Sequence, residues 1–206
     1  MITSYKDMSV SKYMELQELL IEEMDDLSMQ VRILSILSDR TEDDILKMGL
    51  DEYHRMVGGT EFLLNKPNVS SNIPHKLVID GRKYRVCKNV PELNVAQYID
   101  YNNLTRMENK QTMLPYILAC FIVPEGSRYG DDSYKVDEVA AAISEHMSIE
   151  TALGIAFFFH KRYRRLIEGT LTYLDWMIRR MRRKKGMDRK MMETVESQIQ
   201  ILRALV

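Results

Sequence analysis

The sequence is poor in the residues that interrupt regular structure, with five prolines and nine glycines among 206 residues. Folds built from many short strands and tight turns use both residues heavily, so their scarcity disfavours an all-β architecture. The two cysteines, Cys87 and Cys120, form neither a metal-ligand pattern nor a redox motif. A disulfide framework would need more of them, so a reducing compartment is expected.

Long hydrophobic runs are also missing. The longest strongly apolar run, near residues 117–123, is much shorter than the roughly 20 residues that a membrane-spanning helix needs. The first residues lack the apolar centre of a secretory signal peptide. Both absences predict a soluble protein that is not exported.

Charge is present in balance, but it is unevenly distributed. The net charge is −1, yet residues 1–60 carry 13 acidic and six basic side chains, whereas residues 160–190 carry twelve basic and three acidic ones. This separation favours head-to-tail association or an acidic partner over bulk binding to DNA.

The longest helical pattern covers residues 148–185. Ser148 can cap its start, and Gly169 marks the position at which we expect a bend. Its apolar side chains recur every three or four residues, as one face of a helix requires: Ala156, Phe159, Tyr163, Ile167, Leu171, Leu174, Ile178 and Met181.

Shorter helical patterns precede it at residues 9–24, 27–37, 41–49, 51–63, 94–104, 113–123 and 136–146. The helix at 94–104 is expected to turn Val95, Tyr98, Ile99 and Leu104 inward. The run 113–123, the most apolar of all, is expected to be a helix buried on every side.

One segment has a different pattern. Residues 76–87 place Asp80-Gly81 between two β-prone runs, which is typical of a hairpin with a type I′ turn. A lone hairpin is marginally stable, so this one must lie on helices or find a third strand.

The predicted fold is therefore mainly α: a single helical domain at residues 1–185 with one inserted β-hairpin, followed by a C-terminal amphipathic helix at 186–206 that serves docking or oligomerisation. Four apolar residues of that last helix have heptad spacing and form a candidate helix-docking seam: Met192, Val195, Ile199 and Leu202.

No catalytic, cofactor or metal site is predicted. The four histidines fall in different elements without metal-ligand spacing, and no Ser or Cys stands in a nucleophile motif. Asp131-Asp132 lies in a Gly-flanked loop that turn chemistry explains better than cation binding.

Two clusters are candidates for contacts with partners. Phe157, Phe158 and Phe159 are core or partner aromatics, and because consecutive helical residues are about 100° apart, at least one ring must face away from the core. The second cluster is a basic run that suits an acidic protein surface, with nucleic acid less favoured and membrane attachment least: Arg179, Arg180, Arg182, Arg183, Lys184 and Lys185.

Several segments in succession resemble tail assembly chaperone-type proteins of bacteriophages, especially those that infect gut Bacteroides. They include YKDMSVSKY, IDGRKY, LNVAQYID and AFFF, and they occur at residues 5–13, 30–46, 50–53, 79–84, 93–100, 124–125 and 156–159. The segment after Gly186 has no counterpart in that pattern.

The resemblance implies a small, helical, non-enzymatic morphogenesis protein that binds apolar helices of the tape measure protein in the host cytoplasm. Two alternatives stay open. One is a structural virion component, such as a ring, connector or cargo protein, that assembles through its acidic N-terminal and basic C-terminal helices. The other is a DNA-contacting accessory protein.

Overall fold

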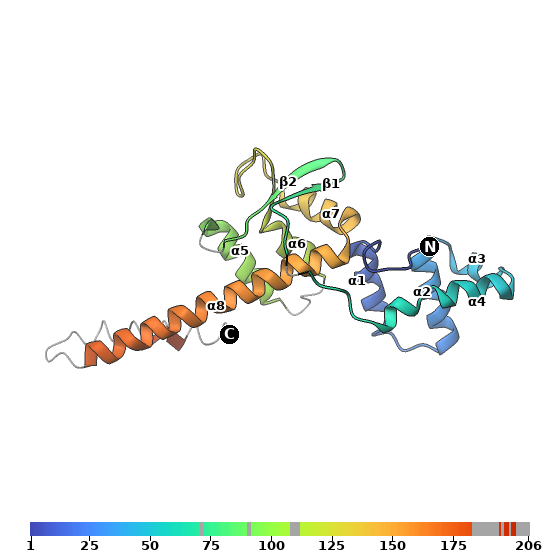
Figure 1. The fold of residues 1–206 in the computed structure, drawn as a ribbon, viewed down its shortest axis with the longest axis horizontal. Helices are drawn as coiled ribbons and strands as arrows, with labels where there is room; N and C mark the ends of the chain where they lie inside the picture. The colour runs from blue at the N-terminus through green and yellow to red at the C-terminus, as the bar shows by residue number, and fades with distance from the viewer. Residues whose placement is uncertain are drawn as a thin grey trace. The chain divides into compact units, whose positions relative to one another are not determined.

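The computed structural model describes residues 1–70, 72–89, 92–107 and 112–182, together with residues 194, 196–197 and 199–200. The protein is mainly helical with one small antiparallel sheet, as predicted (Figure 1). It forms two compact units, Met1–Ala156 and Phe157–Val206. The predicted boundary between residues 185 and 186 lies outside the described residues and stays a prediction.

The first unit begins with four α-helices and a 3-10 turn, and side chains cap the starts of the first three helices. The elements are α1 (Val10–Leu19), α2 (Asp26–Ser38), α3 (Glu42–Leu46), α4 (Leu50–Gly58) and η1 (Glu61–Leu64). Thr41 and Asp44 form a reciprocal capping box at α3, as its sequence predicts. α1 ends at Leu19 rather than near residue 24, and Asp25, in an extended conformation, caps the start of α2.

The predicted hairpin is confirmed. Strands β1 (Lys76–Ile79) and β2 (Arg82–Val86) pair antiparallel, with Ile79 opposite Arg82. Asp80 and Gly81 have φ angles of 47° and 69°, the left-handed pair that a type I′ turn requires. A third strand, β3 (Ile122–Pro124), pairs with β2 on its other side, so the hairpin is not left alone.

The predicted helix over 113–123 is wrong in its second half. α6 covers only Leu114–Ala119, and after a turn at Cys120 and Phe121 the chain forms β3 from Ile122 onward. A short, uniformly apolar run has no period that separates a buried helix from a buried strand. The free side of β2 decided the outcome, because a strand there satisfies backbone groups that would otherwise be buried unpaired.

The predicted inner face of the 94–104 helix is also wrong. In α5 (Val95–Thr105) the buried residues are Gln97 and Tyr101, whereas Val95 and Ile99 are exposed. The Gln97 amide donates to the Cys120 carbonyl at 2.8 Å. A buried polar contact of this kind rotates the helix away from the face that hydropathy alone selects.

The core of the first unit closes around α7 (Val136–His146) and the start of α8 (Ile149–Arg182). The backbone N–H of Ile149 donates to the Met8 carbonyl at 2.8 Å, and that of Val10 donates to the Met147 carbonyl at 3.1 Å. Met8 and Ile149 are fully buried. The N-terminal segment is thus bound to the junction of α7 and α8.

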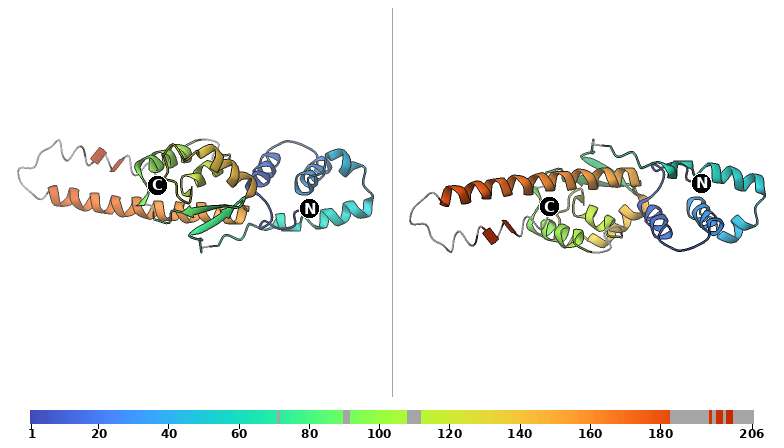
Figure 2. Two further views of the ribbon diagram at one scale, coloured as in Figure 1. Left: turned by 90° about the horizontal axis from the view of Figure 1, so that it is seen from above. Right: turned by 90° about the horizontal axis from the view of Figure 1, so that it is seen from below.

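α8 runs unbroken from Ile149 to Arg182 and includes Gly169 in its interior (Figure 2). The Ser148 cap is confirmed, since its hydroxyl accepts from the Thr151 N–H at 3.3 Å. Gly169 does not interrupt the helix, since one glycine in a helix interior costs only about 1 kcal/mol relative to alanine. The bend expected there stays a prediction. The compact units instead divide between Ala156 and Phe157.

Candidate interaction surfaces

The predicted basic run is described only in part. Arg179 is an exposed residue of α8, and Arg180 and Arg182 belong to the same helix. Arg183, Lys184 and Lys185 lie outside the described residues. The run therefore stays a predicted contact for an acidic surface.

The predicted docking seam is represented by Ile199, since Met192, Val195 and Leu202 lie outside the described residues. Ile199 is buried and forms a small cluster with Leu174 and Ile178, against which Leu171 and Met177 also pack. The one described seam residue thus contacts the chain's own α8 helix. This contact covers one apolar face of α8 within the second unit.

The three consecutive phenylalanines differ in exposure, as their helical spacing requires. Phe159 is buried, whereas Phe157 is 61% exposed. The guanidinium of Arg162 lies 4.9 Å from the centre of the intermediate Phe158 ring, a cation–π geometry between helical neighbours. Only Phe157 is open to a partner among these rings.

A second apolar face lies on α8, which we call the α8 strip: Leu166, Gly169, Tyr173 and Trp176. Its three side chains are between 41% and 57% exposed, and the Tyr173 and Trp176 ring centres are 5.9 Å apart. The steps of three, four and three residues match a coiled-coil seam. Helical geometry places the strip roughly 150° around the axis from Leu174 and Ile178. This part of α8 is therefore apolar on two nearly opposite faces.

The connection between α1 and α2 is a second exposed apolar surface, which we call the acidic turn: Glu18, Leu20, Ile21, Glu23, Asp26 and Leu27. Its three apolar side chains are between 58% and 77% exposed. The turn is ordered by its backbone, since the N–H groups of Ile21 and Glu22 donate to the carbonyls of Glu18 and Leu19, each at 3.1 Å. Glu22 forms an ion pair with Arg32.

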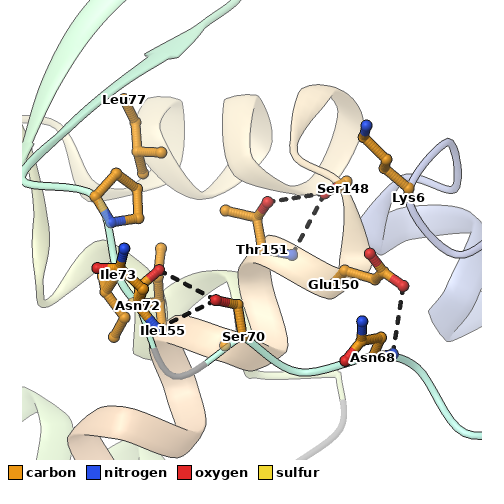
Figure 3. Close-up of a pocket in the computed structure, with 12 residues that line it drawn as sticks. Lys6, Asn68, Ser70, Asn72, Ile73, Leu77, Ser148, Glu150, Thr151 and Ile155 are labelled. Atoms are coloured by element: carbon orange, nitrogen blue, oxygen red, sulfur yellow. Dashed lines mark hydrogen bonds between the residues drawn. The ribbon is translucent and has the colours of Figure 1, made fainter.

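A groove of about 340 Å³ lies where the linker before β1 crosses the start of α8 (Figure 3). The Glu150 carboxylate accepts from the Asn68 N–H at 3.3 Å. The Ser70 carbonyl passes so close to Gly154 that a Cβ there would lie 3.2 Å from it. These contacts seat the chain's own linker, so we interpret the groove as structural.

The outer face of the sheet is basic, which the sequence reading missed. Lys76 stands opposite Arg85, and Val78 opposite Lys83, all exposed. The sequence contained a signal for this basic face: residues two apart in a strand lie on the same face, and Lys83 and Arg85 of the hairpin are spaced in this way. The Lys76 ammonium pairs with Glu125 at 2.6 Å and lowers the pKa of that carboxyl.

Tyr129 and Tyr134, two tyrosines near Cys120 in the first unit, have hydrogen-bonded hydroxyl groups. The Tyr134 hydroxyl donates to the Ala119 carbonyl at 2.7 Å, and that of Tyr129 to the Asp100 carboxylate at 2.8 Å. Burial raises the pKa of Cys120 to about 12, so its thiol is protonated near neutral pH.

Across the described part of the chain, no three His, Cys, Asp or Glu side chains gather as metal ligands would. Nor does any helix in those residues combine the length and apolarity needed to cross a bilayer. His146 lies 4.0 Å from Asp80 and 3.7 Å from Glu145, and all three are exposed. Asp131 and Asp132 are exposed turn residues.

Comparison of the chain with protein-family models, with curated proteins and with solved structures found no match. The α8 strip was missed as a site by sequence reasoning. Of the acidic turn, sequence reasoning considered only the acidic charge of the N-terminal helices as an assembly surface and missed the exposed apolar side chains. Leu166, Tyr173 and Trp176 are spaced for one face of a helix. They were overlooked because a longer apolar stripe on the same helix was taken as its only apolar face. The acidic turn was hidden inside a helix predicted to continue to residue 24.

Proposed function

We propose that this protein is a non-enzymatic bacteriophage morphogenesis protein of the tail assembly chaperone type. It binds apolar helical segments of a tail protein, such as the tape measure protein, in the cytoplasm of the bacterial host. The observation that carries the proposal is the α8 strip, and the resemblance of residues 5–159 to such chaperones supports it.

The geometry of the α8 strip suits a helix as its ligand. From Leu166 to Trp176 it extends for about 15 Å, which is nearly three turns. Gly169 lies in open space, with no atom within 4 Å of a Cβ built on it, so a partner's side chain can enter there. Tyr173 and Trp176 supply rigid, amphipathic rings of the kind that carry most energy in protein interfaces.

The charges around the strip select among apolar helices. Arg165 and Arg179 are exposed beside it, and no ion pair holds either of them within the described residues. A ligand helix with acidic residues flanking its apolar stripe would pair with them, while a basic helix would be repelled. The client is therefore an amphipathic helix of acidic character.

Trp176 is the only tryptophan of the chain, so its fluorescence reports directly on the strip. We would titrate the protein with a synthetic peptide of about three heptads that carries Leu at positions a and d and Glu beside them. Binding moves the Trp176 emission to shorter wavelength, because the indole leaves water. The substitution Tyr173→Glu should weaken binding about tenfold or more, whereas Leu64→Glu, at another exposed apolar position, should not.

Mass spectrometry of purified particles tests the biological role. A chaperone is expected to be absent from mature particles. Its presence at fixed stoichiometry would contradict the proposal and favour a structural virion component. Salt-dependent DNA binding that is lost on charge reversal of Arg179 and its basic neighbours would favour the DNA-contacting alternative.

A further inference from the structure

We infer that the acidic turn of one copy docks on the α8 strip of a second copy, so that the free protein associates head to tail. This interaction uses two different surfaces of the same chain. It also implies, on the basis of the proposed function, that a client helix must displace the neighbouring copy from the strip.

The apolar parts of the two surfaces are complementary in kind. The acidic turn presents Leu20, Ile21 and Leu27, which are aliphatic and exposed, on a short connection that backbone hydrogen bonds hold in place. The α8 strip presents two aromatic rings beside an open position at Gly169. Aliphatic side chains that enter a gap between rings bury apolar area on both partners, and such central contacts dominate interface energies.

The charged parts are complementary in sign. Glu18, Glu23 and Asp26 are exposed around the apolar centre of the turn, and Arg165 and Arg179 are exposed around that of the strip. Within the described residues none of these five groups forms an ion pair. Opposite charges around apolar centres fix the register of docking and disfavour contact of like with like, turn on turn or strip on strip.

This choice of partner follows from the chain itself. An acidic turn needs a surface that is both basic and broadly apolar. The α8 strip exposes three large apolar side chains, whereas the basic outer face of the sheet exposes one, Val78. Because the two surfaces differ, the contact is heterologous and leaves one free surface of each kind at the ends of every dimer. Association should therefore continue with concentration, either to a closed ring or to longer chains.

Sedimentation velocity of the full chain tests this directly, over a range of concentrations. The wild type should sediment as species larger than the monomer at high concentration. Ile21→Glu places a charge in the apolar centre of the acidic turn, and Tyr173→Glu places one in the α8 strip. Each substitution alone should weaken self-association about tenfold or more. Leu64→Glu is the matched control and should behave as the wild type.

The decisive experiment is the mixture of the two broken variants. Ile21→Glu retains an intact strip and Tyr173→Glu retains an intact turn, so an equimolar mixture should form a dimer with one copy of each and no larger species. A mixture that stays monomeric overturns the inference, as does a wild type that is monomeric throughout the concentration range. Equal loss of association in the Leu64→Glu control also overturns it.

The peptide of the fluorescence assay separates this inference from the proposed function. The Ile21→Glu variant should bind the peptide at least as tightly as the wild type, since no neighbour competes for the strip. If the peptide fails to bind while the mixture still dimerises, the proposed function is wrong and the self-association stands. If the peptide binds without displacing the neighbouring copy, the inferred competition is wrong.

Discussion

The two compact units differ in how far their apolar side chains are buried. The first buries a large core that includes Phe121, Ile143 and Ile149, and its buried side-chain hydroxyl and amide groups have hydrogen-bond partners among the described residues. The second has a small described cluster of Leu174, Ile178 and Ile199. On the same helix it leaves the α8 strip exposed.

The contrast suggests that the first unit determines the stability of the fold and that the exposed strip of the second unit serves interaction with a partner. A unit whose core is closed and hydrogen-bonded gains little from a partner on that core. A helix with a second apolar face is stabilised by any ligand that covers the face, because removal of apolar area from water is favourable. We therefore expect mutations in the first unit to affect folding and mutations on the strip to affect binding.

A matched pair of phenylalanines should give the largest difference. Phe121 is 1% exposed and its ring centre lies 5.1 Å from that of Tyr101, whereas Phe157 is 61% exposed. Phe121→Ala should lower the free energy of unfolding by about 3–5 kcal/mol, the usual cost of a large core cavity. Phe157→Ala should change it by less than about 0.5 kcal/mol. Urea unfolding followed by circular dichroism measures both, and equal losses would contradict the assignment of the core.

The small cluster of the second unit should be less sensitive. Ile178→Ala removes a buried side chain from contact with Leu174 and Ile199. We expect a loss of about 2 kcal/mol, at the low end for Ile→Ala, because the cluster is small and can relax. Trp176 fluorescence during urea unfolding, at a concentration below self-association, measures the effect. No change would show that Ile199 does not hold its segment against α8.

Alkaline pH should weaken the first unit selectively. Burial raises the pKa of Cys120 from 9.0 to about 12, so above pH about 9 the unfolded chain loses this proton while the native protein keeps it. The free energy of unfolding then falls with rising pH, by about 1 kcal/mol at pH about 10. Burial likewise raises the pKa of Tyr101 to about 12, which extends the fall above pH about 10. Cys120→Ala should reduce the first part of the slope, to which Cys87 also contributes because burial raises its pKa as well. An identical pH profile in that variant would refute this cause.

Two glycines of α8 should give the smallest effects, with different outcomes in the two units. Nothing lies within 4 Å of a Cβ placed at Gly169, so Gly169→Ala should raise the free energy of unfolding by about 1 kcal/mol. At Gly154 the Cβ would lie 3.2 Å from the Ser70 carbonyl oxygen, so Gly154→Ala should bring no gain. Thermal unfolding of both variants measures this. An equal gain would mean that the linker yields to the added methyl group.

Much of the local structure was determined by the sequence alone. Ser148, Thr41 and the pair Asp80-Gly81 act through their own backbone neighbourhoods, so their caps and turn could be predicted without knowledge of the fold. The uneven charge that suggested head-to-tail contact is likewise written in the sequence. The sequence alone indicates only roughly where on the chain such a contact would lie.

Tertiary structure decided which faces were used. Ile122 became part of a strand because β2 had an unpaired side, and Gln97 turned inward because the Cys120 carbonyl needed a donor. The long helix α8 has a second apolar face. That face is exposed among the described residues, although its side chains are as apolar as many that are buried. Hydropathy measures only the preference of a residue for burial. Packing among distant segments determines whether that preference is met within the chain or left for a partner.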